Sequence, residues 1–321
     1  MLPVPDRPVA EGIQVTFDPV VQERLDATAS EIGAGVGHEP SSWKAKANDD
    51  EELTEDLAAH ELWRRCADDL GYGFLSEELS ETEWQRWRDS LASRERRRVR
   101  ILVSDPIDGS SEWNRAGWRH SPLTTAAMVV ETTLPDATDN VVCAATVGAI
   151  WQERTWSLNT DSVVVKPWSA QTVGKTVRLA DEKRNLTTSE TMAAAYFPTA
   201  RHARIVAPLY ELVPYLHNLG GIPFSLRVIE GRSRRSYGAS IEPLPAASWE
   251  LVGLVFAAVG GAAVARLDGA PISLNPFIRQ TSIVAVNHRV LNDLTTAISN
   301  RNDGVTVAHV APLRQLGPNL E

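Results

Sequence analysis

The chain has 321 residues, 43% of them hydrophobic and 23% charged, a composition that provides a large core and excludes both a disulfide-stapled miniprotein and a disordered chain. Its net charge of -9 opposes general nucleic-acid binding, because the nucleic-acid backbone is also negative. Two cysteines without a paired spacing predict reduced thiols. Since the sequence shows neither a signal peptide nor an apolar segment of the ~20 residues that a membrane span needs, we expect a cytoplasmic protein without membrane contacts.

Helix and strand patterns alternate through the first half of the chain. Apolar residues at helical spacing predict a helix over 16–34, and Thr54 is a suitable N-cap for a second helix. The arginine-rich segment 84–100 is typical of a solvated helix and loop. Short apolar runs predict strands at 72–75, 99–103, 124–131, 141–150 and within 151–166. These elements indicate an antiparallel or mixed sheet with flanking helices.

From Asp181 onward the pattern changes to alternating strands and helices. We expect strands at 203–207, 225–229, 262–267 and 282–286, and helices at 209–219 and 248–259. The change of pattern predicts a division into an N-terminal α+β subdomain at 1–180 and a C-terminal α/β subdomain at 181–295, followed by an extension at 296–321. The expected fold class is therefore a layered α/β protein.

The most informative motif is Asp105-Pro106-Ile107-Asp108-Gly109-Ser110-Ser111, directly after the strand expected at 99–103. Proline restricts the residue before it to an extended conformation, and glycine permits a tight turn. Two carboxylates and a backbone carbonyl can then point into one volume, as hard divalent cations require. The two serines, with the N–H groups of a helix start, would face an anion such as phosphate.

Metal-dependent phosphoryl transfer usually needs more than two carboxylates. Three other acidic residues lie at the ends of expected elements: Asp56 near a helix start, Glu77 after a strand, and Glu250 at the start of an apolar helix. From these positions their side chains can converge on one cleft, although they are distant in sequence.

Together these motifs resemble the inositol monophosphatase family, the lithium-sensitive, Mg²⁺-dependent phosphomonoesterases related to fructose-1,6-bisphosphatase. The resemblance covers roughly residues 20 to 295 and rests on Thr54 with Asp56, Ser76-Glu77-Glu78, the Asp105–Ser110 hexapeptide, Trp249-Glu250, and Gly260-Gly261 followed by Asp268-Gly269. It implies an αβαβα sandwich with two subdomains, a homodimer, and two or three Mg²⁺ ions. Segments 57–61 and 75–78 look closest to the branch that removes phosphate from 3'-phosphoadenosine 5'-phosphate.

The resemblance also implies roles for individual residues. A first Mg²⁺ would be held by Glu77, Asp105 and the Ile107 carbonyl, and a second by Asp105, Asp108 and Glu250. Asp56 and Ser110 would activate the attacking water, and Glu77 counts with them as catalytic. The expected substrate-binding residues are Lys46, Gly109, Ser110, Ser111, Arg234 and Arg235.

Three features depart from the family pattern. Glu250 stands where the family has aspartate, which adds one methylene to a ligand. The segment with Asp56 is one residue shorter than usual, so Glu55 is an alternative to Asp56. The glycine-rich turn of the second subdomain corresponds to Gly231-Arg232-Ser233-Arg234-Arg235, and we expect substrate selection to differ there.

Each candidate also has an ordinary structural interpretation. Asp105 and Asp108 alone could form an Asx turn, Glu77 could be a surface glutamate, and the arginines of 231–235 are typical of a solvated turn. The leading hypothesis is a phosphomonoesterase for a small phosphorylated alcohol, such as an inositol or sugar phosphate. The alternatives are a 3'-phosphoadenosine 5'-phosphate type nucleotidase and a catalytically impaired relative that binds phosphate ligands.

Overall fold

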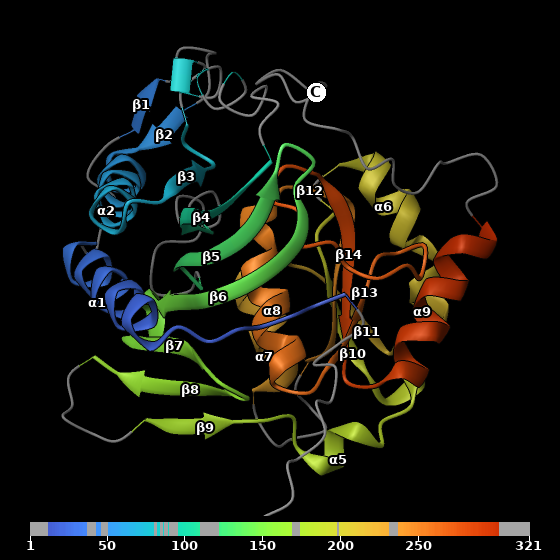
Figure 1. The fold of residues 1–321 in the computed structure, drawn as a ribbon. Helices are drawn as coiled ribbons and strands as arrows, with labels where there is room; N and C mark the ends of the chain where they lie inside the picture. Colours follow the sequence, from blue (N-terminus) through green and yellow to red (C-terminus); the bar gives the residue numbers. More distant parts are fainter. Residues whose placement is uncertain are drawn as a thin grey trace, which may run out of the picture.

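A computed structural model describes residues 12–36, 43–45, 51–79, 82–83, 86, 89, 96–109, 122–168, 174–197, 199–230 and 237–301. Helices and sheets alternate in layers (Figure 1). Helices α1 (Pro19–Gly35) and α2 (Thr54–Leu70) cover the outer face of a first sheet. Helices α7 (Ile222–Ile229) and α8 (Val252–Val259) lie between this sheet and a second one, which α6 (Ala200–Val206) and α9 (His288–Arg301) cover on its far side. The layered α/β class is confirmed.

Within the described residues the first sheet has seven strands, in the order β3-β4-β5-β6-β7-β8-β9. Their bounds are β3 Gly73–Ser76, β4 Arg97–Asp108, β5 Thr124–Leu134, β6 Thr138–Ala149, β7 Arg154–Asn159, β8 Ser162–Pro167 and β9 Lys175–Val177. Strand β3 is parallel to β4, and the other neighbours are antiparallel. A separate pair, β1 (Trp43–Ala45) and β2 (Glu51–Leu53), precedes α2.

Both faces of the first sheet are buried, which explains its long apolar runs. Along β5, Ala127 and Val129 pack with α1 and α2, whereas Met128 and Val130 belong to the cluster shared with α7 and α8. The inner face of α1 repeats Val21, Leu25, Ala29 and Ile32 at helical spacing. Asp18 caps this helix by accepting a hydrogen bond from the Val21 N–H at 3.3 Å. Each of the fully buried valine, leucine and isoleucine side chains contributes about 1.5–3 kcal/mol.

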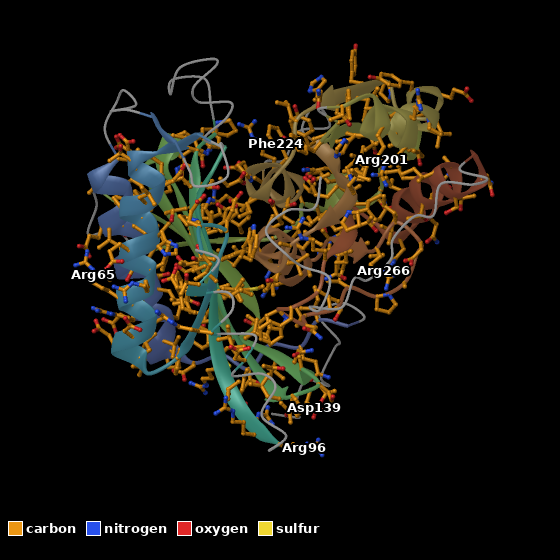
Figure 2. The ribbon with its side chains drawn as sticks, turned by 90° about the horizontal axis from the view of Figure 1, so that it is seen from above. Arg65, Arg96, Asp139, Arg201, Phe224 and Arg266 are labelled. Carbon is orange, nitrogen blue, oxygen red and sulfur yellow. The ribbon has the colours of Figure 1, made fainter. Side chains whose placement is uncertain are left out.

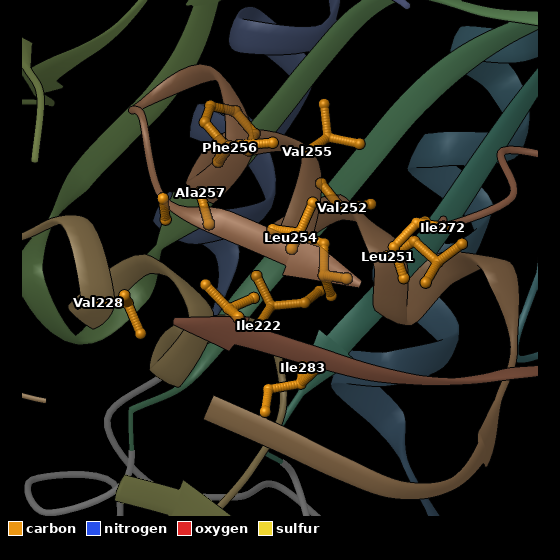
Figure 3. Close-up of a cluster of buried hydrophobic side chains, with 14 of the residues drawn as sticks. Ile222, Val228, Leu251, Val252, Leu254, Val255, Phe256, Ala257, Ile272 and Ile283 are labelled. Atoms are coloured by element: carbon orange, nitrogen blue, oxygen red, sulfur yellow. The ribbon is translucent and has the colours of Figure 1, made fainter. Parts of the chain in front are cut away.

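The second sheet has five strands among the described residues, in the order β11-β10-β12-β14-β13. Their bounds are β10 Met192–Ala195, β11 Tyr215–Asn218, β12 Tyr237–Ala246, β13 Ala263–Ala265 and β14 Gln280–Ala285. Figure 3 shows the apolar contacts between this sheet and the central helices, with Ile222, Leu254 and Ile283 facing one another. Gly253 allows the two helices to approach, because a Cβ there would lie 2.9 Å from the Ser225 Cβ.

Helix α7 is held at its carboxyl end by a buried lysine. Lys183 lies on the short helix α5 (Asp181–Arg184), and its Nζ donates to the carbonyls of Arg227, Val228 and Glu230 at 3.3, 2.5 and 3.2 Å. These carbonyls have no partner within the helix. Burial lowers the pKa of Lys183 to about 8. The lysine therefore fixes the end of a helix whose other end reaches the cleft described below.

Three sequence expectations in the second half are wrong. Residues 203–206 belong to helix α6 and Ala207 to the 3₁₀ turn after it, not to a strand, and residues 225–229 belong to helix α7. The predicted helix at 209–219 is replaced by a short 3₁₀ turn (Ala207–Glu211) and strand β11. Short apolar runs do not distinguish strand from buried helix, and the start signals decide: Thr199 caps α6 by accepting from the His202 N–H, and Pro223 opens α7.

The other expected helices and strands in the described residues are found, except that segment 84–100, expected to be a solvated helix and loop, enters β4 at Arg97. Residues 248–259 form a 3₁₀ turn, η4 (Ser248–Leu251), followed by α8. The predicted subdomain division at residue 180 falls between β9 and β10 and stays a prediction. In the described part of the chain, no helix is both long and apolar enough to cross a membrane. Most of segment 84–95 and all of 302–321 lie outside the described residues.

Candidate active site

The Asp-Pro-Ile-Asp motif forms the irregular end of β4. The strand runs through Asp108 and does not stop before Asp105 as its sequence suggested. Asp105 pairs with Ala126 and Asp108 with Thr124, so β4 has one more residue than β5 between these two pairs. Such a bulge bends the strand and redirects its side chains, and Pro106 cannot donate to a neighbouring strand. Asp105 is 1% exposed, and Asp108 is half-buried. Gly109 then turns the chain with a φ of 91°.

Glu77 reaches the same edge of the sheet because β3 and β4 are parallel. Ser76, the last residue of β3, pairs with Ser104 of β4, so Glu77 comes next to the level of Asp105. Glu77 is exposed and lines a cleft together with Asp105 and Asp108. The structure therefore brings these three carboxylates together as the sequence predicted.

Two further acidic residues approach from other elements. Glu250, in η4, lies 142 positions beyond Asp108 and lines the same cleft. The Ser248 hydroxyl fixes this turn by donating to the Pro276 carbonyl at 2.7 Å. Asp56, in the first turn of α2, is 5% exposed. Glu55, its alternative, occupies the adjacent position in that turn.

The charges of these carboxylates oppose one another. The pKa of Asp105 is raised well above its usual value, first by burial and then by the negative charges of Glu77, Asp108, Glu250 and Asp56. Burial and three nearby carboxylates likewise raise the pKa of Glu250, against a smaller opposing effect from Arg279. The cleft thus gathers like charges that cost folding free energy unless protons or cations neutralise them.

Sequence reasoning missed the side of the cleft formed by the start of α7. The Gly221 N–H donates to Glu242 Oε1 at 2.9 Å, and the Ile222 N–H donates to Asp108 Oδ2 at 2.8 Å. Gly221 has a φ of 81°, and a Cβ there would lie 2.6 Å from Asp108 Oδ2, so glycine is required. Burial and the charge of Asp108 raise the pKa of Glu242 to about 7, against the hydrogen bond from Gly221.

Comparison with solved structures identifies this arrangement of layers. Extragenic suppressor protein suhB from Bartonella henselae is 12% identical, with a TM-score of 0.59 over 89% of this chain and 100% of that one. An IMPase/NADP phosphatase, solved with NADP and Ca²⁺, is 13% identical, with a TM-score of 0.63 over 89% of this chain and 97% of that one. Staphylococcal inositol monophosphatase-1 is 13% identical, with a TM-score of 0.59 over 88% and 92%. The chain has the inositol monophosphatase fold.

No protein-family sequence model matches the chain, and no curated protein sequence matches it either. The likeness at these identities is one of fold. The inositol monophosphatase fold agrees with the αβαβα sandwich that the motifs implied, and it covers both halves of the chain that supply the carboxylates.

The donor set of this inositol monophosphatase fold suits a hard divalent cation. It consists of oxygen atoms, and Asp105 Oδ1 is buried without a hydrogen-bond partner. As they stand, no three His, Cys, Asp or Glu side chains of the described residues are arranged to hold a metal ion. Asp108 instead accepts the Ile222 N–H. The residues therefore fit a cation in type and location, and Asp108 would have to turn to join a shared site.

Several predicted substrate residues cannot be placed in the inositol monophosphatase fold. Lys46, Ser110, Ser111, Arg234 and Arg235 lie outside the described residues, as does the whole segment 231–236. Among the predicted substrate residues, Gly109 is described and lines the cleft. Ile107, whose carbonyl was predicted to be a ligand, is 4% exposed and lines the cleft as well.

Proposed function

We propose that this protein is a Mg²⁺-dependent phosphomonoesterase that hydrolyses a small phosphorylated alcohol. The observation that carries the proposal is the buried Asp105, which is surrounded by the charges of four other carboxylates. These come from α2, from the residue after β3, from β4 and from η4. Proteins do not retain such repulsion for stability, and a cleft that concentrates it is a candidate for cation binding. The shared fold and the Asp-Pro-Ile-Asp motif support the same activity.

The proposal includes two cation positions, as the family resemblance implies. Glu77, Asp105 and the Ile107 carbonyl would hold one, and Asp105, Asp108 and Glu250 the other. When bound, the cations would neutralise the carboxylates and offset the charge of the phosphate group. Asp105 belongs to both positions, which agrees with its central and most buried location.

The residues of the chain supply proton transfer and orientation. A water oxygen attacks phosphorus, the bond between phosphorus and the alcohol oxygen breaks, and the products are the alcohol and inorganic phosphate. The Asp56 carboxylate would accept the proton of the attacking water. Glu242, oriented by the Gly221 N–H, would accept a hydrogen bond from the alcohol part of the substrate.

The experiment is a phosphate-release assay with a panel of phosphate esters, titrated with Mg²⁺ and repeated in excess chelator. We expect Mg²⁺-dependent release by the parent protein and none by Asp108→Asn, which removes a charge and keeps the volume. Circular dichroism and thermal unfolding of the variant control for its fold. Unchanged turnover in Asp108→Asn would exclude the assigned site.

Glu250 in place of aspartate favours one competing function, an impaired relative that binds phosphate esters without cleaving them. In that case no ester releases phosphate at any Mg²⁺ concentration, and calorimetry still detects Mg²⁺-dependent binding of an ester. The same two measurements therefore separate the two functions.

A further inference from the structure

The cleft is lined by two kinds of side chain. Carboxylates make up the part assigned above to phosphate chemistry. The remaining side chains are largely apolar, and they include Pro122, Tyr196, Leu219, Pro223 and Phe224. The proposed reaction uses none of them, and their place in the cleft lining suits contact with the alcohol part of a substrate.

Tyr196 is the most unusual of these side chains. It directly follows β10, and its N–H donates to the Ile241 carbonyl at 3.1 Å, which fixes its backbone. Four large hydrophobic side chains are exposed among the described residues, and of these Tyr196, at 38%, lines the cleft. Its ring stands nearly edge-on to His202, with centroids 6.2 Å apart. A largely apolar ring is thus presented to the cleft from a fixed backbone.

Gly220 brings this ring next to the polar part of the cleft. A Cβ at Gly220 would lie 2.5 Å from the Tyr196 Cβ and 2.7 Å from Glu242 Oε1. Only a residue without a side chain allows the tyrosine and the carboxylate to approach from both sides. The aromatic ring and the polar anchor proposed for the alcohol are therefore neighbours.

A second aromatic ring is fixed at the start of α7. Phe224 is 5% exposed and lines the same cleft. Its ring packs edge-on against Tyr237, with centroids 5.3 Å apart, and the Arg227 guanidinium lies 5.6 Å from its centre. In Figure 2, Phe224 is labelled among the C-terminal elements, on their side toward the first sheet. The two rings give the cleft an aromatic surface held by the fold.

Resting on the proposed phosphatase function, we propose that Tyr196 determines substrate specificity and, with Phe224, favours phosphate esters whose alcohol carries a flat unsaturated ring. Stacking of a flat ring on an aromatic side chain contributes about 1–3 kcal/mol. A compact polyol offers no such face and would gain only the hydrogen bond to Glu242. The aromatic surface therefore discriminates by ring shape, while the carboxylates act on the phosphate common to all substrates.

The test compares two esters of primary alcohols, 2-phenylethyl phosphate and glycerol 1-phosphate, which share the phosphate and the type of leaving group. The measured quantity is the ratio of their kcat/KM values. Tyr196→Ala should lower this ratio by about 5- to 100-fold, which corresponds to the loss of one stacking contact. Tyr196→Phe retains the ring and should keep the ratio within about twofold of the parent value.

Tyr210→Ala is the matched control, because Tyr210 is 59% exposed and is absent from the cleft lining. It should leave the ratio unchanged. Tyr196→Leu provides a second variant that keeps apolar volume without a flat ring, in case the alanine variant fails to fold, and it should also lower the ratio. Equal losses on both esters, or no loss on either, would overturn the proposal.

The proposed function can fail separately. If the parent protein hydrolyses neither ester, calorimetric titration with 2-phenylethyl phosphate and glycerol 1-phosphate replaces the kinetic ratio. Weaker binding of the phenylethyl ester alone in Tyr196→Ala supports the aromatic surface. Binding of both esters that is unaffected by the substitution excludes it.

Discussion

The two ends of strand β4 differ in the charges that surround their side chains, which are opposite and paired at one end and alike at the other. At its start, Arg100 donates to Asp18 at 2.8 Å, to Glu131 at 2.9 Å and to the Tyr72 hydroxyl at 2.9 Å. At its other end, Asp105 and Asp108 face further carboxylates across the cleft. Figure 2 shows Arg96 and Asp139 near the first end, and Phe224 on the other side of the molecule.

The pKa values express this difference. At the paired end, the hydrogen bond from Arg100 lowers the pKa of Glu131, so its charged form is the stable one. At the cleft end, burial and neighbouring carboxylates raise the pKa of Asp105. One strand therefore carries an end that is neutralised within the chain and an end that needs neutralisation from outside. The charges at the first end therefore stabilise the fold, whereas those at the second end oppose it and suit the proposed cation binding.

Neutralising Asp105 should have the largest effect. Asp105→Asn removes a buried charge from the repelling group, so in chelator the free energy of unfolding should rise by roughly 1–3 kcal/mol. Phosphatase activity should fall by on the order of 1000-fold, because several kcal/mol of transition-state stabilisation is lost. Urea unfolding and phosphate release measure the two effects.

Asp161→Asn is the control for this change, since Asp161 is exposed and lies 3.9 Å from Arg178. It should alter neither quantity. A lower free energy of unfolding for Asp105→Asn than for the parent protein in chelator would contradict the view that the carboxylates repel one another.

Removing the cation at the other end of β4 should destabilise the protein. Arg100→Met leaves the half-buried Asp18 without the Arg100 guanidinium and removes one of the two guanidinium groups that pair with Glu131, which keeps Arg98. It should lower the free energy of unfolding by about 1–2 kcal/mol, with phosphatase activity retained in the folded protein. Arg96→Met is the matched control, because Arg96 and Asp139 form an exposed pair at 3.5 Å. Equal effects of the two substitutions would show that the Arg100 contacts contribute nothing specific.

Shortening Glu250 should produce a smaller change in activity. We expect that η4 lies far enough back for the extra methylene to be needed, so Glu250→Asp withdraws the carboxylate from the cleft. Activity should fall about 10-fold, and half-maximal activation should require more Mg²⁺. A Mg²⁺ titration of both proteins measures this. Tighter activation in the variant would mean that glutamate impairs the site, and no change would mean that Glu250 binds no cation.

The smallest expected effect concerns pH at the paired end. Because the pKa of Glu131 is lowered in the folded protein, its contribution to stability is present above the ordinary value of 4.5 and is lost as pH falls through the folded pKa. Glu131→Gln should therefore cost about 0.5–1 kcal/mol at pH 7, and this difference should vanish in acid. Urea unfolding of both proteins from pH 7 to pH 3 tests it, and a difference independent of pH would contradict it.

The sequence predicted the acidic part of the cleft well because its motif is contiguous. Asp105 and Asp108 are three residues apart, and the strand before them is visible as an apolar run. Glu250 and Glu77 could be added because each lies at the end of an expected element and matches a family motif. Arg98 and Arg100 fell in the segment assigned to a solvated helix and loop, although Arg100 also lay in the strand expected at 99–103. Nothing local indicated that both arginines form ion pairs with Glu131 on β5.

The side formed by α7 was not predicted, and the reason is physical. Its decisive contact joins the Ile222 N–H to Asp108, 114 positions earlier, and no local pattern encodes that pairing. The local signal was Gly220-Gly221 followed by Pro223, which indicates a helix start. Assigning residues 225–229 to a strand concealed it.

The contacts at both ends of α7 limit how the cleft can change size. Lys183 holds three carbonyls at one end, and Asp108 accepts an N–H at the other. Sliding the helix along its axis by one residue, about 1.5 Å, would break both sets of contacts together. If Asp108 turns toward a cation, the amino end keeps only the contact of the Gly221 N–H with Glu242, and the helix would pivot about the lysine more easily. Since Phe224 lies near the moving end, cation binding and the width of the ring-binding surface would change in a single motion.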